Sequence, residues 1–127
     1  MGGRMCDVFL FRDLGLFELA VRGRVCGADD AEVIALVVRH LPERSAIVVD
    51  LSEIDGFDEV AAAAIVDAID LRRSDLVSAA LVVGHPSGGA MLLASGSGRI
   101  APVVGSITAA RDALSREAAS LAEPLSA

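Results

Sequence analysis

Carboxylates dominate the side chains that could carry chemistry in this chain, and four of them lie close together in the sequence: Asp50, Asp55, Asp58 and Glu59. Asp50 is near the end of an apolar run and Asp58 precedes another. A strand followed by a helix would therefore place all four at the carboxyl end of the strand, where open α/β sheets commonly bind ligands. Such a cluster could hold a hard cation such as Mg²⁺. Helix capping and solvated loop acids explain the same residues more simply, so we predict no metal site.

Two glycine-rich segments and two histidines are the other candidates. The segment 84–89, Gly-His-Pro-Ser-Gly-Gly, would let backbone amides approach an anion, but it lacks the spacing and the lysine of a P-loop. The segment 95–99, Ser-Gly-Ser-Gly-Arg, is not the Gly-x-Ser-x-Gly elbow of hydrolases. His40 and His85 have no partner at metal-ligand spacing. We interpret both segments as turns, predict no catalytic residue, metal or cofactor, and do not expect an enzyme.

Composition narrows the function further. All 11 residues in the Lys and Arg class are Arg, which removes lysine-dependent chemistry, and the net charge of −7 disfavours nucleic acid. No apolar stretch approaches the roughly 20 residues of a membrane span. The first residues do not resemble a signal peptide, so we expect a cytoplasmic protein that does not bind membranes. Cys6 and Cys26 are interpreted as structural thiols.

The pattern of apolar residues predicts one α/β domain over residues 1–127, with its core at about 8–121. Val8–Phe11, a turn at 12–15 and an alternating stretch from Phe17 predict a β-hairpin. The remaining elements alternate between helices at 29–41, 58–73, 86–95 and 107–121 and strands at 46–51, 79–84 and 101–104. The order ββαβαβαβα predicts a mixed sheet with helices, opened by the hairpin.

Three local features make this prediction specific. The β-branched run Ala46–Leu51 indicates a central strand buried on both faces, followed by a loop over 52–57. Asp29 and Glu32 are spaced like a capping box for the first helix. The segment Val60–Val66 is apolar nearly all round, so we expect the start of the second helix to be deeply packed.

The segment Val48–Ala61, Val-Val-Asp-Leu-Ser-Glu-Ile-Asp-Gly-Phe-Asp-Glu-Val-Ala, resembles the core signature of STAS domains, the fold of bacterial anti-sigma factor antagonists. In that family a central strand ending in Asp-Leu-Ser leads through a short loop to Asp-Ser-Ser-Gly at the start of a helix. The spacing matches without a gap, and the segments 84–87 and 102–104 also resemble the family. The resemblance covers roughly residues 8–114.

The resemblance also identifies one departure. Asp58 matches the family aspartate, Glu59 the first serine, Val60 the phosphoacceptor serine and Ala61 the glycine. A phosphate at that position would add about −1.5 to −2 charges and repel or remodel a partner. Val60 has no hydroxyl, so this switch is not expected here. Glu59 is interpreted as a first-turn acid, with a phosphate-mimicking charge as the alternative.

The resemblance implies a protein-interaction module that binds an anti-sigma factor, of the kinase type, or a related regulatory complex, and that releases a sigma factor without catalysis. The expected contact edge comprises Asp55, Gly56, Phe57, Asp58, Glu59 and Val60, with further ligand contacts from Asp50, His85 and Ser87. Two alternatives stay open. One is a sensor of a small molecule or nucleotide at the same strand end. The other is a non-regulated scaffold that assembles with other STAS proteins or as a homodimer.

Overall fold

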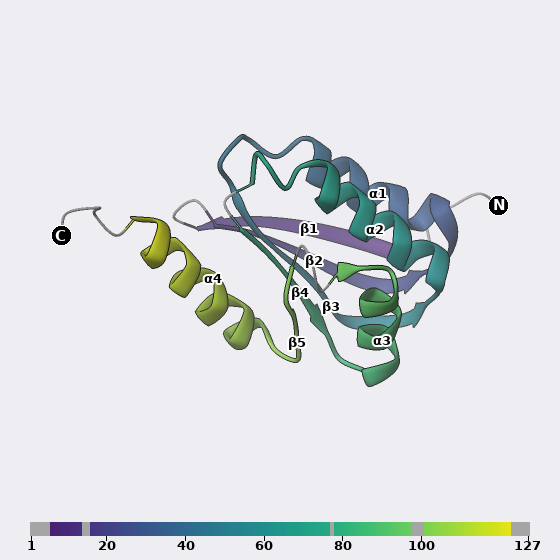
Figure 1. The fold of residues 1–127 in the computed structure, drawn as a ribbon. Helices are drawn as coiled ribbons and strands as arrows, with labels where there is room; N and C mark the ends of the chain where they lie inside the picture. Colours follow the sequence, from purple (N-terminus) through teal and green to yellow (C-terminus); the bar gives the residue numbers. More distant parts are fainter. Residues whose placement is uncertain (1–5, 14–15, 77, 98–100, 123–127) are drawn as a thin grey trace.

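The computed structural model describes residues 6–13, 16–76, 78–97 and 101–122 (Figure 1). Strands and helices alternate after an opening hairpin, in the order predicted. The strands are β1 (Cys6–Asp13), β2 (Leu16–Val25), β3 (Ala46–Phe57), β4 (Ser78–Val83) and β5 (Val103–Val104). The helices are α1 (Gly27–Arg39), α2 (Glu59–Leu71), α3 (Pro86–Ala94) and α4 (Ile107–Ala122).

The five strands form one mixed sheet in the order β1-β2-β3-β4-β5. The hairpin pair β1–β2 is antiparallel, and the pairs β2–β3, β3–β4 and β4–β5 are parallel, as crossover helices require. β3 is therefore the central strand, and Ile47, Val48 and Val49 are fully buried within it. This confirms the prediction of a central strand covered on both faces.

Helices cover both faces of the sheet, but unequally (Figure 1). The larger core joins α1, α2 and Leu92 of α3 to one face, through residues such as Leu19, Val49 and Leu81. On the opposite face α4 covers a smaller cluster made by Val48, Ala80, Val82, Ala110 and Leu114. Alternation along each strand sends neighbouring residues to opposite faces, which is why Val48 and Val49 belong to different cores.

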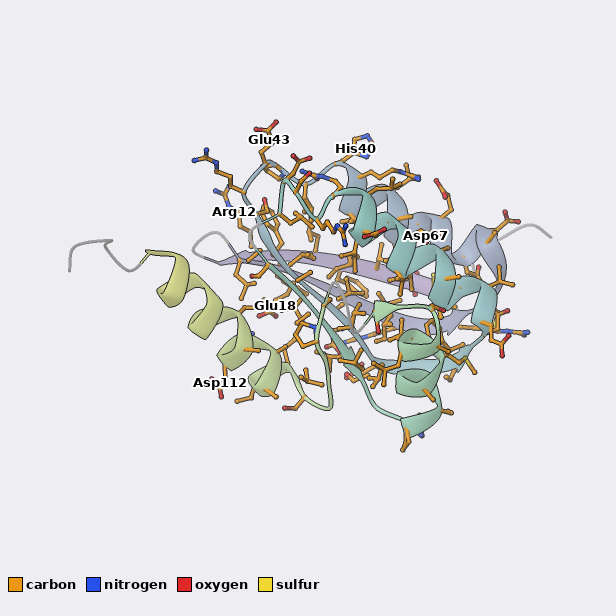
Figure 2. The ribbon with its side chains drawn as sticks, in the orientation of Figure 1. Arg12, Glu18, His40, Glu43, Asp67 and Asp112 are labelled. Atoms are coloured by element: carbon orange, nitrogen blue, oxygen red, sulfur yellow. The ribbon has the colours of Figure 1, made fainter. Side chains whose placement is uncertain are left out.

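Polar contacts hold each layer in place at its margin. Glu18 of β2 lies on the face that α4 covers (Figure 2), and it accepts a hydrogen bond from Arg111 Nε at 2.6 Å. In the larger layer, Arg72 is buried and its Nη1 donates to the carbonyl oxygens of Val38 at 2.9 Å and Leu41 at 2.5 Å. Those carbonyls belong to the last turn of α1 and to the residues after it, so Arg72 ties the end of α2 to the end of α1.

The expected bounds of two strands were wrong. β3 does not end at Leu51 but continues through Phe57, because the long β2 offers a further ladder of partners. Two register shifts interrupt that ladder, and a bulged strand loses the period-two pattern by which a sequence reveals it. The last strand, expected over 101–104, is confined to Val103–Val104.

The start of α1 and the packing of α2 also differ from expectation. α1 begins at Gly27, and its N-cap residue Cys26 makes no side-chain cap, so the expected capping box is absent. Instead Asp30 Oδ2 accepts from the Cys26 amide at 3.1 Å. In α2, Val60 is 56% exposed, so the start of this helix is not packed all round. No helix in the described ranges has the length and apolar character to cross a membrane.

Candidate functional site

The predicted contact edge, Asp55–Val60, lies where β3 ends and α2 begins. β3 pairs with β2 as far as Phe57, with Gly56 opposite Arg24 and Phe57 opposite Val25. Asp58 follows in extended conformation and is the N-cap of α2. The chain thus turns from strand to helix within a single residue, which fixes the direction of the first turn of α2.

Asp58 is the best-connected carboxylate of this region. Its Oδ1 accepts from the Ala61 amide at 2.9 Å, the bond expected of an N-cap aspartate. The same carboxylate also accepts from the Gly27 amide, at 3.1 Å through Oδ1 and 2.9 Å through Oδ2. Gly27 is the first residue of α1, so one side chain caps the starts of two helices that are far apart in the sequence.

These contacts determine the charge state of Asp58. The Ala61 amide contributes most, followed by the Gly27 amide, and together with Val60 and the positive charge of Arg24 they hold the pKa of Asp58 below its usual value. Hydrogen bonds from backbone amides favour the ionised form. The oxygens of the Asp58 carboxylate therefore already have partners, and these hydrogen bonds hold the starts of α1 and α2 in place.

Glu59 and Val60 occupy the first turn of α2 and are both exposed. Ala61 and Ala62, which follow them, are fully buried against the core. The helix thus turns Val60 outward and the two alanines inward. Val60 is consequently an exposed apolar side chain next to the exposed carboxylate of Glu59.

Asp50 lies earlier in β3, and its side chain is hydrogen-bonded to Ser52 of the same strand. Its Oδ1 accepts from the Ser52 amide at 3.0 Å and from the Ser52 hydroxyl at 2.6 Å. Among the described residues no group of three or more His, Cys, Asp or Glu is placed to hold a metal ion. The four acids considered in the sequence therefore do not form a common ligand set there.

A cavity of about 190 Å³ lies beside the contact edge. It brings together five of the predicted residues: Asp55, Gly56, Phe57, His85 and Ser87. Asp50, Asp58, Glu59 and Val60 are not part of its lining. Sequence reasoning missed its apolar walls, which come from β3, β4 and α3 and comprise Leu51, Ile54, Val83 and Met91. The half-buried Ile54 and Met91 could have been noticed as apolar residues next to the predicted turns.

The turn between β4 and α3 forms the far wall of the cavity. Pro86 begins α3, and the Gly88 amide donates to the His85 carbonyl at 3.1 Å, so the glycine-rich segment 84–89 is a strand-to-helix turn as predicted. Gly84 packs against the backbone of β3: a Cβ atom at this position would lie 2.7 Å from the Ser52 carbonyl oxygen. The cavity therefore depends on a glycine at 84.

The chain is thus a mixed α/β domain with a five-stranded sheet, and its central strand leads into the exposed start of a helix. No known family model matches the chain, and no curated protein matches it in sequence. Among solved structures it is similar to an uncharacterized protein of the DUF3478 family from Shewanella loihica, described as having a SpoIIAA-like fold. The two share 15% identity over 90% of this chain and 97% of the other, with a TM-score of 0.55. The chain therefore has the SpoIIAA-like fold of STAS domains, which confirms the fold predicted from the segment Val48–Ala61.

Proposed function

We propose that this protein is a protein-interaction module of the anti-sigma factor antagonist type, which acts by binding and without catalysis. Its partner would be an anti-sigma factor of the kinase type or a related regulatory complex in the bacterial cytoplasm. The contact edge is the segment Asp55–Val60. The fold supports this proposal, and the observation that carries it is the exposed Val60 at the start of α2.

Val60 is a suitable contact because it presents apolar surface at the start of α2. Its side chain is 56% exposed, while the neighbouring Ala61 and Ala62 are fully buried and already fill the interface of α2 with the core. An apolar side chain on a first turn gains free energy only when another surface covers it. Glu59 and Asp55 are exposed in the same segment and add negative charge to it, so we expect the complementary partner surface to have an apolar centre and a basic rim.

Within the predicted edge, the carboxylate of Asp58 accepts hydrogen bonds from the amides of Ala61 and Gly27. We therefore expect it to orient the first turn of α2, while the exposed residues beside it touch the partner. The backbones of Gly56 and Phe57 pair with Arg24 and Val25 of β2. The exposed side chains of this edge are those of Asp55, Glu59 and Val60, and these are the groups that we expect to touch a partner.

The absence of a hydroxyl at Val60 determines how such a module would be regulated. A kinase partner could bind this edge but could not transfer phosphate to the matching position. Binding would then follow mass action, set by the concentrations of the two proteins and their affinity. The partner would remain sequestered for as long as the module is in excess.

The test is affinity capture from the native lysate with wild type, Val60→Arg and Leu71→Arg, followed by mass spectrometry. Leu71 is the matched control because it is 76% exposed and lies on the same helix, about three turns from Val60. We expect wild type and Leu71→Arg to retain an ATP-binding anti-sigma factor that Val60→Arg loses, while all three have the same circular dichroism spectrum.

Incubation of the captured complex with ATP should leave the Val60 peptide without phosphate. Equal retention of the partner by all three proteins would refute the contact edge. Recovery of no anti-sigma factor by wild type would refute the antagonist function itself.

The cavity beside the edge favours a second candidate, a sensor of a small apolar molecule with a polar group. Its walls combine Ile54, Phe57 and Met91 with the polar side chains of His85 and Ser87. A ligand that binds only the native state raises the melting temperature. The test is a thermal-shift screen of wild type and of Met91→Trp, whose larger side chain would fill the cavity. A compound that raises the melting temperature of wild type but not of Met91→Trp binds in the cavity and supports the sensor function. A compound that stabilises both proteins binds elsewhere.

A further inference from the structure

The two edges of the sheet differ sharply. At one edge β5 has two residues, with Pro102 next to it, and therefore offers little backbone for pairing. At the other edge β1 pairs with β2 through eight consecutive residue pairs without a register shift. No described strand lies on the outer side of β1. Its outward N–H and C=O groups form a regular template for another strand.

The side chains at the centre of β1 are both apolar and exposed. Phe9, Leu10 and Phe11 are 44%, 48% and 57% exposed, and they are consecutive. Natural edge strands are commonly protected by charges, prolines or bulges, and the centre of β1 has none of these. Residues 6–12 contain two charged side chains, Asp7 and Arg12. Their charges cancel, so this segment is neutral in a chain of net charge −7.

We propose that β1 is a self-association edge, along which a second copy of this chain pairs antiparallel about a two-fold axis at Phe9. An antiparallel strand is self-complementary in its backbone, because each residue faces an equivalent one after a two-fold rotation. The neutrality of the segment matters because two copies with a net charge of −7 each repel one another, and a neutral strand adds no like charges at the contact. The result is one sheet that continues through both copies.

Charge selects the register. Opposed residues of an antiparallel pair lie on the same face of the sheet. The two-fold axis must therefore set one residue directly opposite its own copy. Setting Phe9 opposite Phe9, or Leu10 opposite Leu10, pairs seven residues of each strand in either case. An axis at Leu10 sets Asp7 opposite Asp13 of the second copy at both ends, and directly opposed like charges are destabilising. An axis at Phe9 sets Asp7 opposite Phe11 instead, with no like charges opposed.

The register about Phe9 also forms apolar rows on both faces. On the side of α4 the two Phe9 rings meet, each with Ala20 of β2 behind it and with the Arg22 guanidinium 5.5 Å from the ring centroid. On the other side Val8 is opposite Leu10 of the second copy. Behind these lie their β2 partners, Val21 and Leu19, both buried. Aromatic and aliphatic cross-strand pairs are the units that stabilise a sheet.

This inference does not rest on the proposed function, since β1 shares no residue with the contact edge Asp55–Val60. Its first test is disulfide trapping with Phe9→Cys and Leu10→Cys, run beside wild type because Cys6 and Cys26 are retained. Directly opposed residues have Cα atoms about 4.5–5.5 Å apart, within the range of a disulfide. The two copies of residue 10 would be diagonal, about 7–8 Å apart, which is too far.

We expect Phe9→Cys to give a disulfide-linked dimer under mild oxidation, joined through the introduced cysteines, while Leu10→Cys and wild type give none. Cross-linking of Leu10→Cys alone would overturn the register. Light scattering supplies the second measurement: wild type should have twice the 13.0 kDa mass of one chain. Phe9→Lys, which opposes two charges at the axis, should have the mass of one chain, and Leu71→Lys should remain a dimer. A wild-type mass of one chain, or an unchanged dimer in Phe9→Lys, would overturn the proposal.

Discussion

Replacing Gly84 by alanine tests the packing that shapes the cavity. The added Cβ would lie 2.7 Å from the Ser52 carbonyl oxygen, whereas ordinary contacts begin at 3.4 Å, so the backbones must separate by about 0.7 Å. Ser52 cannot move freely, because its amide and hydroxyl are both bonded to Asp50. Overpacking of this kind costs about 1–3 kcal/mol.

A smaller effect opposes this cost. Gly84 does not have a positive φ, so alanine at this position gains about 0.4–1 kcal/mol from the reduced entropy of the unfolded chain. We therefore expect Gly84→Ala to lower the free energy of unfolding by about 1–2 kcal/mol, a balance of the overpacking and entropy terms. Gly105→Ala is the matched control: no atom lies within 4 Å of its Cβ and its φ is not positive, so it should be neutral or stabilising.

The assay is urea unfolding followed by far-ultraviolet circular dichroism, since the chain has no Trp or Tyr. The midpoint should fall for Gly84→Ala with an unchanged slope, which reports a change of stability and not of the unfolded state. If Gly84→Ala proves as stable as Gly105→Ala, the close approach of β3 and β4 at this point does not restrain the backbone, and the account of the cavity wall is wrong.

Two further stability predictions follow from polar contacts. Because its pKa is lowered in the folded protein, Asp58 stabilises the fold fully above the ordinary aspartate pKa of about 3.9 and loses that contribution as the pH falls through its folded pKa. The difference in urea midpoint between wild type and Asp58→Asn should thus be largest at pH 7 and shrink below about pH 4; a difference that is constant with pH would contradict this. Arg72→Met should cost about 2–3 kcal/mol, because two carbonyl oxygens lose a charged donor. Arg73→Met, at an exposed pair with Asp70, should cost less than about 1 kcal/mol, and equal losses would refute the assignment.

The sequence was sufficient for the order of elements and for the central strand. Alternation after Phe17 and the apolar run Ala46–Leu51 are direct consequences of how strands are buried, so they predict the hairpin and the middle of the sheet. The extension of β3 to Phe57 was not predictable, because register shifts between Ala20 and Arg22 and between Gly23 and Arg24 disrupt the period that the sequence would otherwise show.

The sequence did not reveal the contacts that each residue of the candidate site makes. Asp58 was recognised as a helix start from its local sequence, yet its bond to Gly27 spans 31 residues and depends on how α1 and α2 pack. The exposure of Val60 was missed for a related reason: an alanine-rich helix is apolar on every side, so its sequence does not show which side faces the core.

The two unequal cores give the protein two levels of local stability. α4 is held by the small cluster around Val48, Val82 and Leu114 and by the Glu18–Arg111 pair, whereas α1 and α2 share the large core. Detaching α4 therefore breaks few contacts and leaves the main core closed. α4 comes after all the other described elements along the chain, and it docks on a sheet whose strands precede it. It is therefore a separate cover on the main body, and we expect it to open at a lower free energy than that at which the whole domain unfolds.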